Sequence, residues 1–91
     1  MATIVHPFTR AIARTLLAVR RARKMSQAKV SHLMSVEGVE IHRSTISRIE
    51  RGQLDITMGD LAAFCRVYRV QVGYLMLSAE MGRLMPEAVK R

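Results

Sequence analysis

Residues 42–52, His-Arg-Ser-Thr-Ile-Ser-Arg-Ile-Glu-Arg-Gly, decide the fold of this chain. On a helix with about 100° per residue, one face spanning about 140° would carry Arg43, Ser44, Ser47 and Arg48. Ile46 and Ile49 would point the opposite way. Arginine can bond two acceptors on a guanine edge, and serine can donate to bases or phosphates. The pattern therefore predicts a short helix fixed to a core and offering a face suited to DNA, although an ordinary solvated helix has the same polar outer face.

The chain is short and strongly basic. Its 91 residues suffice for one small hydrophobic core, and its formal net charge is +8. Residues 1–51 hold ten Lys or Arg and three acids, whereas residues 52–91 hold five and four. A basic half favours a polyanion as partner. Since two Phe, two Tyr and no Trp offer little surface for stacking single-stranded bases, duplex DNA fits better.

The sequence lacks the residue patterns that are typical of several other classes of function. The single cysteine, Cys65, cannot form an internal disulfide, and His6, His32 and His42 lack the spacing of metal ligands. Without a carboxylate pair, phosphate loop or nucleophile–base arrangement, we predict neither an enzyme nor a cofactor. No apolar run reaches the roughly 18 residues of a membrane span. The N-terminus is similar in composition to a mitochondrial transit peptide, but it continues into a core helix, so we expect a cytoplasmic protein.

Apolar spacing and capping residues predict four helices besides the one over 42–52, and so an all-α fold, a compact bundle of about five short helices. The first opens at Pro7 or Thr9 and carries the stripe Phe8, Ile12, Leu16 and Val19. The second follows the N-cap Ser26, stops at Gly38 and carries Val30, Leu33, Met34 and Val36.

The remaining two helices lie in the second half of the chain. Thr57 caps a helix that carries Leu61, Phe64, Cys65, Val67 and Tyr68. A short fifth helix holds Val72, Leu75 and Met76. We therefore expect a domain over residues 1–78 and a C-terminal tail over 79–91, which either contributes to dimerisation or is disordered.

Two short helices in succession, the second with a polar outer face, form a helix-turn-helix unit. The residues resemble the lambda-repressor/Cro-like proteins, also called the XRE family, from about Leu16 to Leu77. The resemblance rests on Arg20, the Ser26-Gln27 pair, Val30, the run from Arg43 to Glu50, Gly52, and the segment from Leu61 to Met76. The run before Gly52 is the specific part, whereas a Ser-Gln pair alone would be a weak signal.

This resemblance implies a role for each residue that matches the family motif. The base-reading positions are Arg43, Ser44, Ser47 and Arg48. The phosphate-binding positions are Gln27, Thr45, Arg51, Gly52 and Gln53, with backbone amides of the loop after the recognition helix among the donors.

Arg20 and Glu50 match an internal ion pair between the first helix and the recognition helix. The pair also has a rationale of its own, because Glu50 is the only acid between Glu40 and Asp55 and a lone carboxylate facing DNA would repel it. A free surface glutamate is the alternative.

The chain departs from the family pattern in three places. About five extra residues, around Ser35 to Val39, lengthen the turn before the recognition helix, which puts the angle between the two helices in question. His42 stands where a small hydroxyl cap is common, so it caps poorly unless its imidazole takes that role or the helix begins elsewhere. Arg69 stands where glycine often ends the fourth helix, and a left-handed residue there would cost strain.

The function implied is that of a sequence-specific double-stranded DNA-binding transcription regulator, encoded by a bacterium, phage or plasmid. We expect a repressor that acts as a homodimer on an inverted-repeat operator. The candidate dimer interface is Met76, Leu77, Met81, Leu84 and Met85, and the alternative role of these side chains is packing over their own core.

Three other functions stay open. The first is an antitoxin that represses its own operon and holds a toxin protein on another surface. The second is a protein-interaction adaptor that no longer binds DNA, against which the outward arginines argue. The third is a basic amphipathic membrane binder, which is disfavoured because the core needs the apolar stripe of the first helix.

Overall fold

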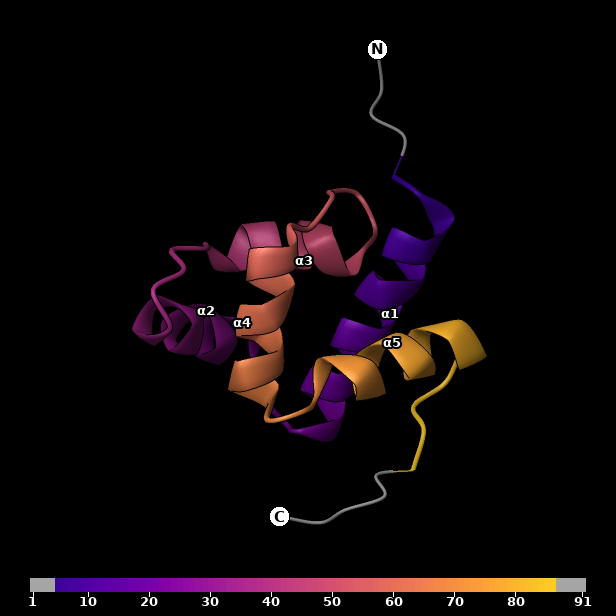
Figure 1. Ribbon diagram of the computed structural model, residues 1–91. Helices are drawn as coiled ribbons and strands as arrows, with labels where there is room; N and C mark the ends of the chain where they lie inside the picture. Colours follow the sequence, from indigo (N-terminus) through magenta and orange to yellow (C-terminus); the bar gives the residue numbers. More distant parts are fainter. Residues whose placement is uncertain (1–4, 87–91) are drawn as a thin grey trace.

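A computed structural model describes residues 5–86, and its regular structure consists of helices packed around one core (Figure 1). The helices are α1 (Pro7–Ala22), α2 (Gln27–Val36), α3 (Arg43–Glu50), α4 (Met58–Tyr68) and α5 (Val72–Met81). Helix α1 contacts α3, α4 and α5, and α2 contacts α3 and α4. Since these five helices are joined by segments without any strand within residues 5–86, the predicted all-α class is confirmed.

Local capping explains where the helices begin and end. The Ser26 Oγ accepts a hydrogen bond from the amide of Lys29 at the start of α2, and Thr57 Oγ1 accepts from the amide of Asp60 at the start of α4. Gly38 has φ +88° just beyond α2, and Gly52 has φ +73° just beyond α3. Both glycines adopt the left-handed conformation that ends a helix at low cost.

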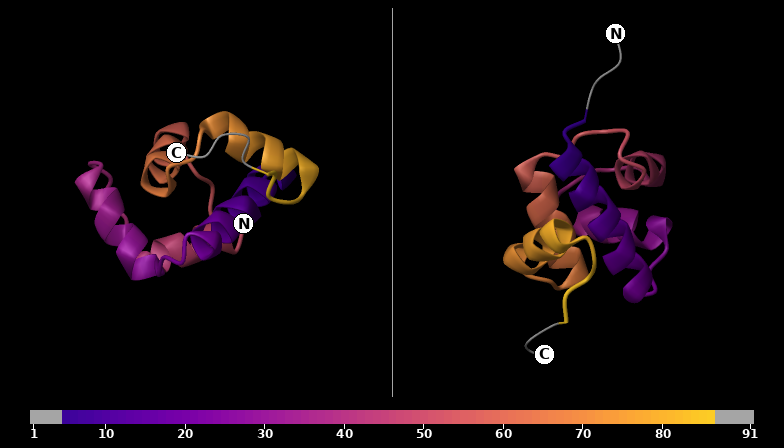
Figure 2. Two further views of the ribbon diagram at one scale, coloured as in Figure 1. Left: turned by 90° about the horizontal axis from the view of Figure 1, so that it is seen from below. Right: turned by 90° about the vertical axis from the view of Figure 1, so that its right-hand side faces the viewer.

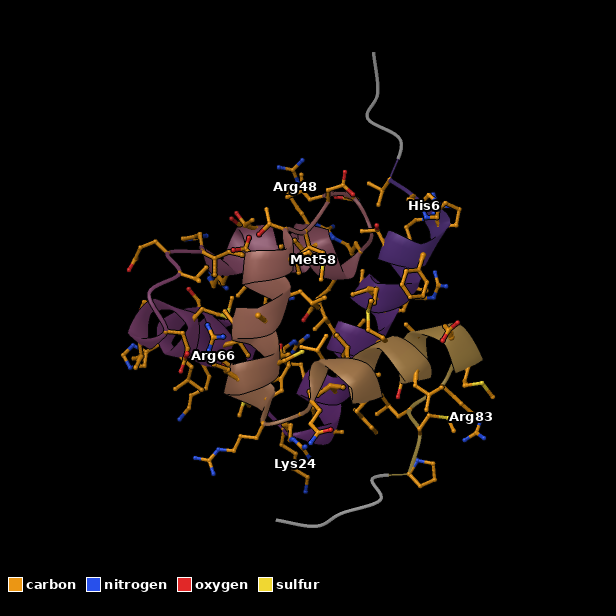
Figure 3. The ribbon with its side chains drawn as sticks, in the orientation of Figure 1. His6, Lys24, Arg48, Met58, Arg66 and Arg83 are labelled. Carbon is orange, nitrogen blue, oxygen red and sulfur yellow. The ribbon has the colours of Figure 1, made fainter. Side chains whose placement is uncertain are left out.

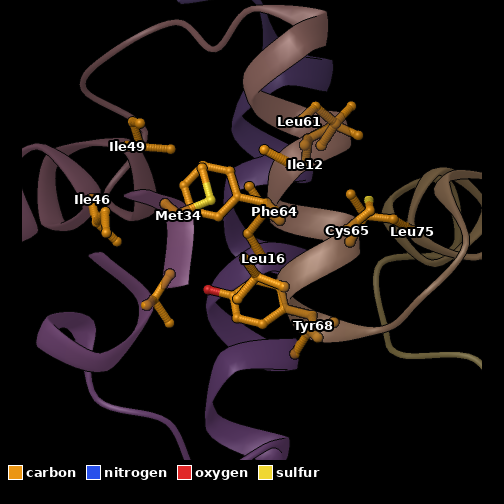
Figure 4. Packing of buried hydrophobic residues seen from close by; sticks show 14 of the residues in the cluster. Ile12, Leu16, Met34, Ile46, Ile49, Leu61, Phe64, Cys65, Tyr68 and Leu75 are labelled. Atoms are coloured by element: carbon orange, nitrogen blue, oxygen red, sulfur yellow. The ribbon is translucent and has the colours of Figure 1, made fainter. Parts of the chain in front are cut away.

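The core receives apolar side chains from all five helices, and Figure 4 shows Ile46 and Ile49 pointing from α3 into it. The phenyl ring of Phe64 and the phenol ring of Tyr68 lie 6.1 Å apart between centroids, within the distance at which aromatic rings attract each other. Val36 is an exception to the predicted core, since it is 70% exposed at the last turn of α2. Val36 follows the buried Met34 by two residues, which at about 100° per residue places its side chain on nearly the opposite side of α2.

Helix α5 packs along α1, and the two lie side by side in Figures 1 and 2. It continues to Met81, three residues beyond Ser78, the last residue of the expected domain. The chain then folds back, because the amide of Met85 donates to Ser78 Oγ and the hydroxyl of Tyr74 donates to the Met85 carbonyl. The division into a domain and a tail stays a prediction, and residues 1–4 and 87–91 lie outside the described range.

Two helix ends carry a basic residue in the left-handed conformation. Lys24 and Arg69 both have φ +58°, at the ends of α1 and α4. This conformation costs a residue with a Cβ roughly 1–2 kcal/mol. The strain predicted for Arg69 is therefore present, and the two ends are joined because Arg23 Nε donates to the carbonyl of Tyr68 at 2.9 Å.

Candidate nucleic-acid interface

Helix α3 separates its polar and apolar side chains as its sequence requires. Ile46 and Ile49 are 0% and 3% exposed, respectively, and hold the helix against the core. Arg43 and Arg48 are exposed, and Figure 3 shows Arg48 projecting away from the body of the protein. The other candidate base-reading and phosphate-binding positions of this helix are the exposed Ser44 and the half-buried Thr45 and Ser47. The helix thus offers two guanidinium groups on a rigid, well-anchored element.

The N-terminus of α3 is capped by a histidine. The Nδ1 atom of His42 accepts a hydrogen bond from the amide of Ser44 at 3.1 Å and lies 2.8 Å from the Ser44 hydroxyl. The imidazole therefore takes the capping role that a small hydroxyl residue would have. As a consequence, the Ser44 hydroxyl already has a partner in the free protein.

Behind α3 lies a buried polar cluster centred on Glu50, which is 5% exposed. Its carboxylate accepts from Arg20 Nε at 2.7 Å and from Arg20 Nη2 at 3.0 Å. It also accepts from Gln27 Nε2 at 2.9 Å. We call these three residues the Glu50 hub. It ties α1 and α2 to the last residue of α3, and so fixes this helix from two sides.

The electrostatics of the hub keep its arginine charged. The hydrogen bond to Glu50 raises the pKa of Arg20, an effect that burial partly opposes. A further bond from Arg20 Nη1 to the Met25 carbonyl uses another donor of the guanidinium. Glu50 is the only carboxylate in α3, and its burial in the hub leaves the outer face of this helix without negative charge.

The side chain of Gln27, a predicted phosphate-binding residue, is bonded within the protein. Its side-chain amide points inward to Glu50, so in the free protein this group braces α3. Its backbone amide lies in the first turn of α2, where helix N–H groups lack partners within the helix. The phosphate contact by Gln27 stays a prediction, and this backbone group is available for it.

The lengthened turn before α3 is well fixed. Ser31 Oγ donates to the carbonyl of Ile41 at 2.6 Å, and the amide of Val39 donates to the Met34 carbonyl at 2.9 Å. Glu37 forms an ion pair with Arg66 of α4 at 2.6 Å. These contacts hold the extra residues in one conformation, and α2 and α3 still pack against each other.

The loop after α3 uses its own backbone amides to end the helix. The amides of Arg51, Gly52 and Gln53 donate to the carbonyls of Ser47, Ile49 and Arg48, respectively. The side chains of Arg51 and Gln53, both exposed, are therefore the groups here that can reach a phosphate. Gly52 provides the turn, and its part in phosphate binding stays a prediction.

The candidate dimer residues lie on α5 and just after it. Leu77 is 46% exposed and Met81 is 53% exposed, so both present apolar surface to solvent. The other three candidates, Met76, Leu84 and Met85, are partly buried. Of these, Met76 and Leu84 pack against the core. Packing over the core therefore accounts for part of the candidate interface, and Leu77 and Met81 remain its exposed part.

Among residues 5–86, no group of three or more His, Cys, Asp or Glu side chains is placed to hold a metal ion. No helix in the described part of the chain has the length and apolar character needed to cross a membrane. Burial raises the pKa of the Cys65 thiol, as suits a core residue.

Comparison with known families agrees with this geometry. A family model described as a helix-turn-helix domain matches residues 11–73, which run from the second turn of α1 to the start of α5. Searches among curated proteins and solved structures gave no significant match. The matched segment contains the whole Glu50 hub and all of α3.

Proposed function

Because this chain belongs to the lambda-repressor/Cro-like (XRE) type of helix-turn-helix family, we propose that it is a regulator that reads a specific sequence in double-stranded DNA. The observation that supports this most directly is the outer face of α3. Arg43 and Arg48 are exposed there, while the only carboxylate of the helix is held in the Glu50 hub. Guanidinium groups on a helix in the major groove can each form two bonds to a guanine.

The mode of action we propose is repression by a homodimer in the cytoplasm. Two copies joined through Leu77 and Met81 would present two α3 helices to successive turns of the major groove. Half-sites would then lie about 34 Å apart and be arranged as an inverted repeat, which mirrors the symmetry of the dimer. Binding of the dimer over a promoter would block polymerase.

The experiment starts from duplexes selected by the purified protein from a random library, or from an inverted repeat upstream of its own gene. Fluorescence anisotropy then gives the dissociation constant for the selected duplex and for random DNA. Arg43→Ala and Arg48→Ala should each weaken specific binding by about 1–3 kcal/mol and lower the ratio of specific to random affinity.

The matched control is Arg83→Ala, which removes an exposed arginine that lies beyond α5, well away from Arg48 in Figure 3. It should leave the ratio of specific to random affinity unchanged. Equal ratios in wild type, both α3 variants and this control would refute base reading by α3.

A further inference from the structure

Arg10 of α1 packs against the loop that follows the recognition helix. A Cβ atom built on Gly52 would lie 3.1 Å from Cγ and 3.3 Å from Cδ of Arg10, so the aliphatic stem of the arginine rests directly on the glycine backbone. Figures 1 and 2 show this loop, between α3 and α4, beside the first turns of α1. The absence of a side chain at Gly52 is what lets the stem approach.

The charged end of Arg10 has no partner within the described range. Arg10 is exposed, and its guanidinium makes no hydrogen bond or ion pair with any of residues 5–86. The packing of its stem keeps the cation close to this loop, while the guanidinium keeps all its donors for a ligand. A cation that is kept near this loop and has unused donors is suited to binding an anion.

The place of this cation is defined by the loop it covers. Gly52 lies between Arg51 and Gln53, whose exposed side chains are the proposed phosphate contacts at the end of α3. The amide of Gln53 donates to the carbonyl of Arg48, which keeps the loop folded against α3. Arg10 thus adds a third side chain to the two of the loop, from a helix that is not part of the helix-turn-helix unit.

We propose that Arg10 is a further DNA-binding residue, which binds a backbone phosphate next to the end of α3 and adds affinity without reading sequence. This inference rests on the proposed function. A purely structural role, in which the stem only covers Gly52 or the charge only favours the C-terminus of α3, would give no effect on the salt dependence of DNA binding.

The test replaces Arg10 with methionine, which keeps an apolar stem over Gly52 and removes the charge. Arg14→Met is the matched control, because Arg14 is exposed one turn further along α1. There it lines a cavity with Ala79 of α5 and with Gly82 and Arg83, which follow α5. The dissociation constants of all three proteins are measured on a random duplex and on the selected duplex, at a series of NaCl concentrations.

We expect Arg10→Met to reduce the slope of log affinity against log salt by about 0.9, the value for the loss of one phosphate contact. Both duplexes should lose affinity by the same factor, and Arg14→Met should keep the wild-type slope. An Arg10→Met slope equal to that of wild type and control would overturn the inference while DNA binding itself stands. Failure of the wild-type protein to bind DNA would overturn the proposed function and this inference together.

Discussion

Helices α3 and α5 each turn one face to solvent, and these faces have opposite chemistry. The outer face of α3 carries Arg43 and Arg48, whereas α5 exposes Leu77 and Met81. An exposed guanidinium group costs little free energy in water, and it contributes favourable binding free energy when it neutralises a phosphate. Exposed leucine and methionine gain only when apolar surface covers them, by about 25 cal/mol per Å². The two helices are therefore suited to different partners, a nucleic acid for α3 and a protein surface for α5.

The two helices also differ in how their inner faces are held. The inner face of α3 combines two isoleucines with the Glu50 hub, so part of its support is ionic. The inner face of α5 relies on Leu75 and Ala79, with Ser78 bonded to the returning tail. Ionic support fixes direction more strictly than apolar packing, because hydrogen bonds require a narrow geometry. A helix proposed to read base edges would benefit from that strictness.

Removal of the Glu50 charge from the hub should have the largest effect on the free energy of unfolding. Glu50→Gln leaves Arg20 charged and only 13% exposed in its side chain, without its carboxylate partner. We expect a loss of about 3 kcal/mol in the free energy of unfolding, as is usual for breaking a buried ion pair. Urea denaturation at neutral pH measures it.

The chain offers a close control for that substitution in the ion pair of Glu37 with Arg66. The distance from Arg66 Nε to Glu37 Oε1 is 2.6 Å, close to the 2.7 Å between Arg20 and Glu50. However, the side chain of Arg66 is 56% exposed and that of Glu37 is 34% exposed. Because solvent screens this pair, Glu37→Gln should cost less than about 1 kcal/mol. Similar losses for the two variants would show that burial gives α3 no special support.

Much of this architecture could be predicted because it depends on local signals. The caps at Ser26 and Thr57 and the glycines that end α2 and α3 act within four residues, and the structure has all of them. The apolar periods of α1 and α4 likewise predicted most of the residues that are buried, although Phe8 is only half-buried. The family resemblance added Arg20 and Glu50, which form the ion pair across 30 residues of sequence.

Other features depend on contacts that no local pattern contains. The bond from Gln27 to Glu50 joins residues 23 apart, and the contact of Arg10 with Gly52 arises only when α1 meets the loop. The sequence did not predict that α5 extends to Met81. Serine is usually a surface residue, whereas Ser78 is 0% exposed in this helix. Gly82, with φ +74°, marks that end and was the signal available.

The apolar face of α5 can be tested by changing its exposed side chains. Leu77→Ser and Met81→Ser should leave the free energy of unfolding of the monomer nearly unchanged but weaken dimerisation by about 2 kcal/mol each, the gain from burying such a side chain. Sedimentation at a series of concentrations measures the dimer dissociation constant. Val36→Ser is the control, since Val36 is 70% exposed on a different helix and should have no effect. Equal dissociation constants for all four proteins would remove α5 from the dimer interface.

The smallest effect on stability is expected at the turn that leads from α4 into α5. Helix α3 ends at a glycine with positive φ, whereas α4 leads into α5 through Arg69 with φ +58°. Arg69→Gly should therefore stabilise the protein by about 0.5–1 kcal/mol, since relief of left-handed strain exceeds the extra freedom of glycine in the unfolded chain. Arg69→Ala removes the same charge but keeps the Cβ atom, so it should give no gain. A gain in thermal stability shared equally by both variants would mean that the charge of Arg69, rather than its backbone, is what destabilises this turn.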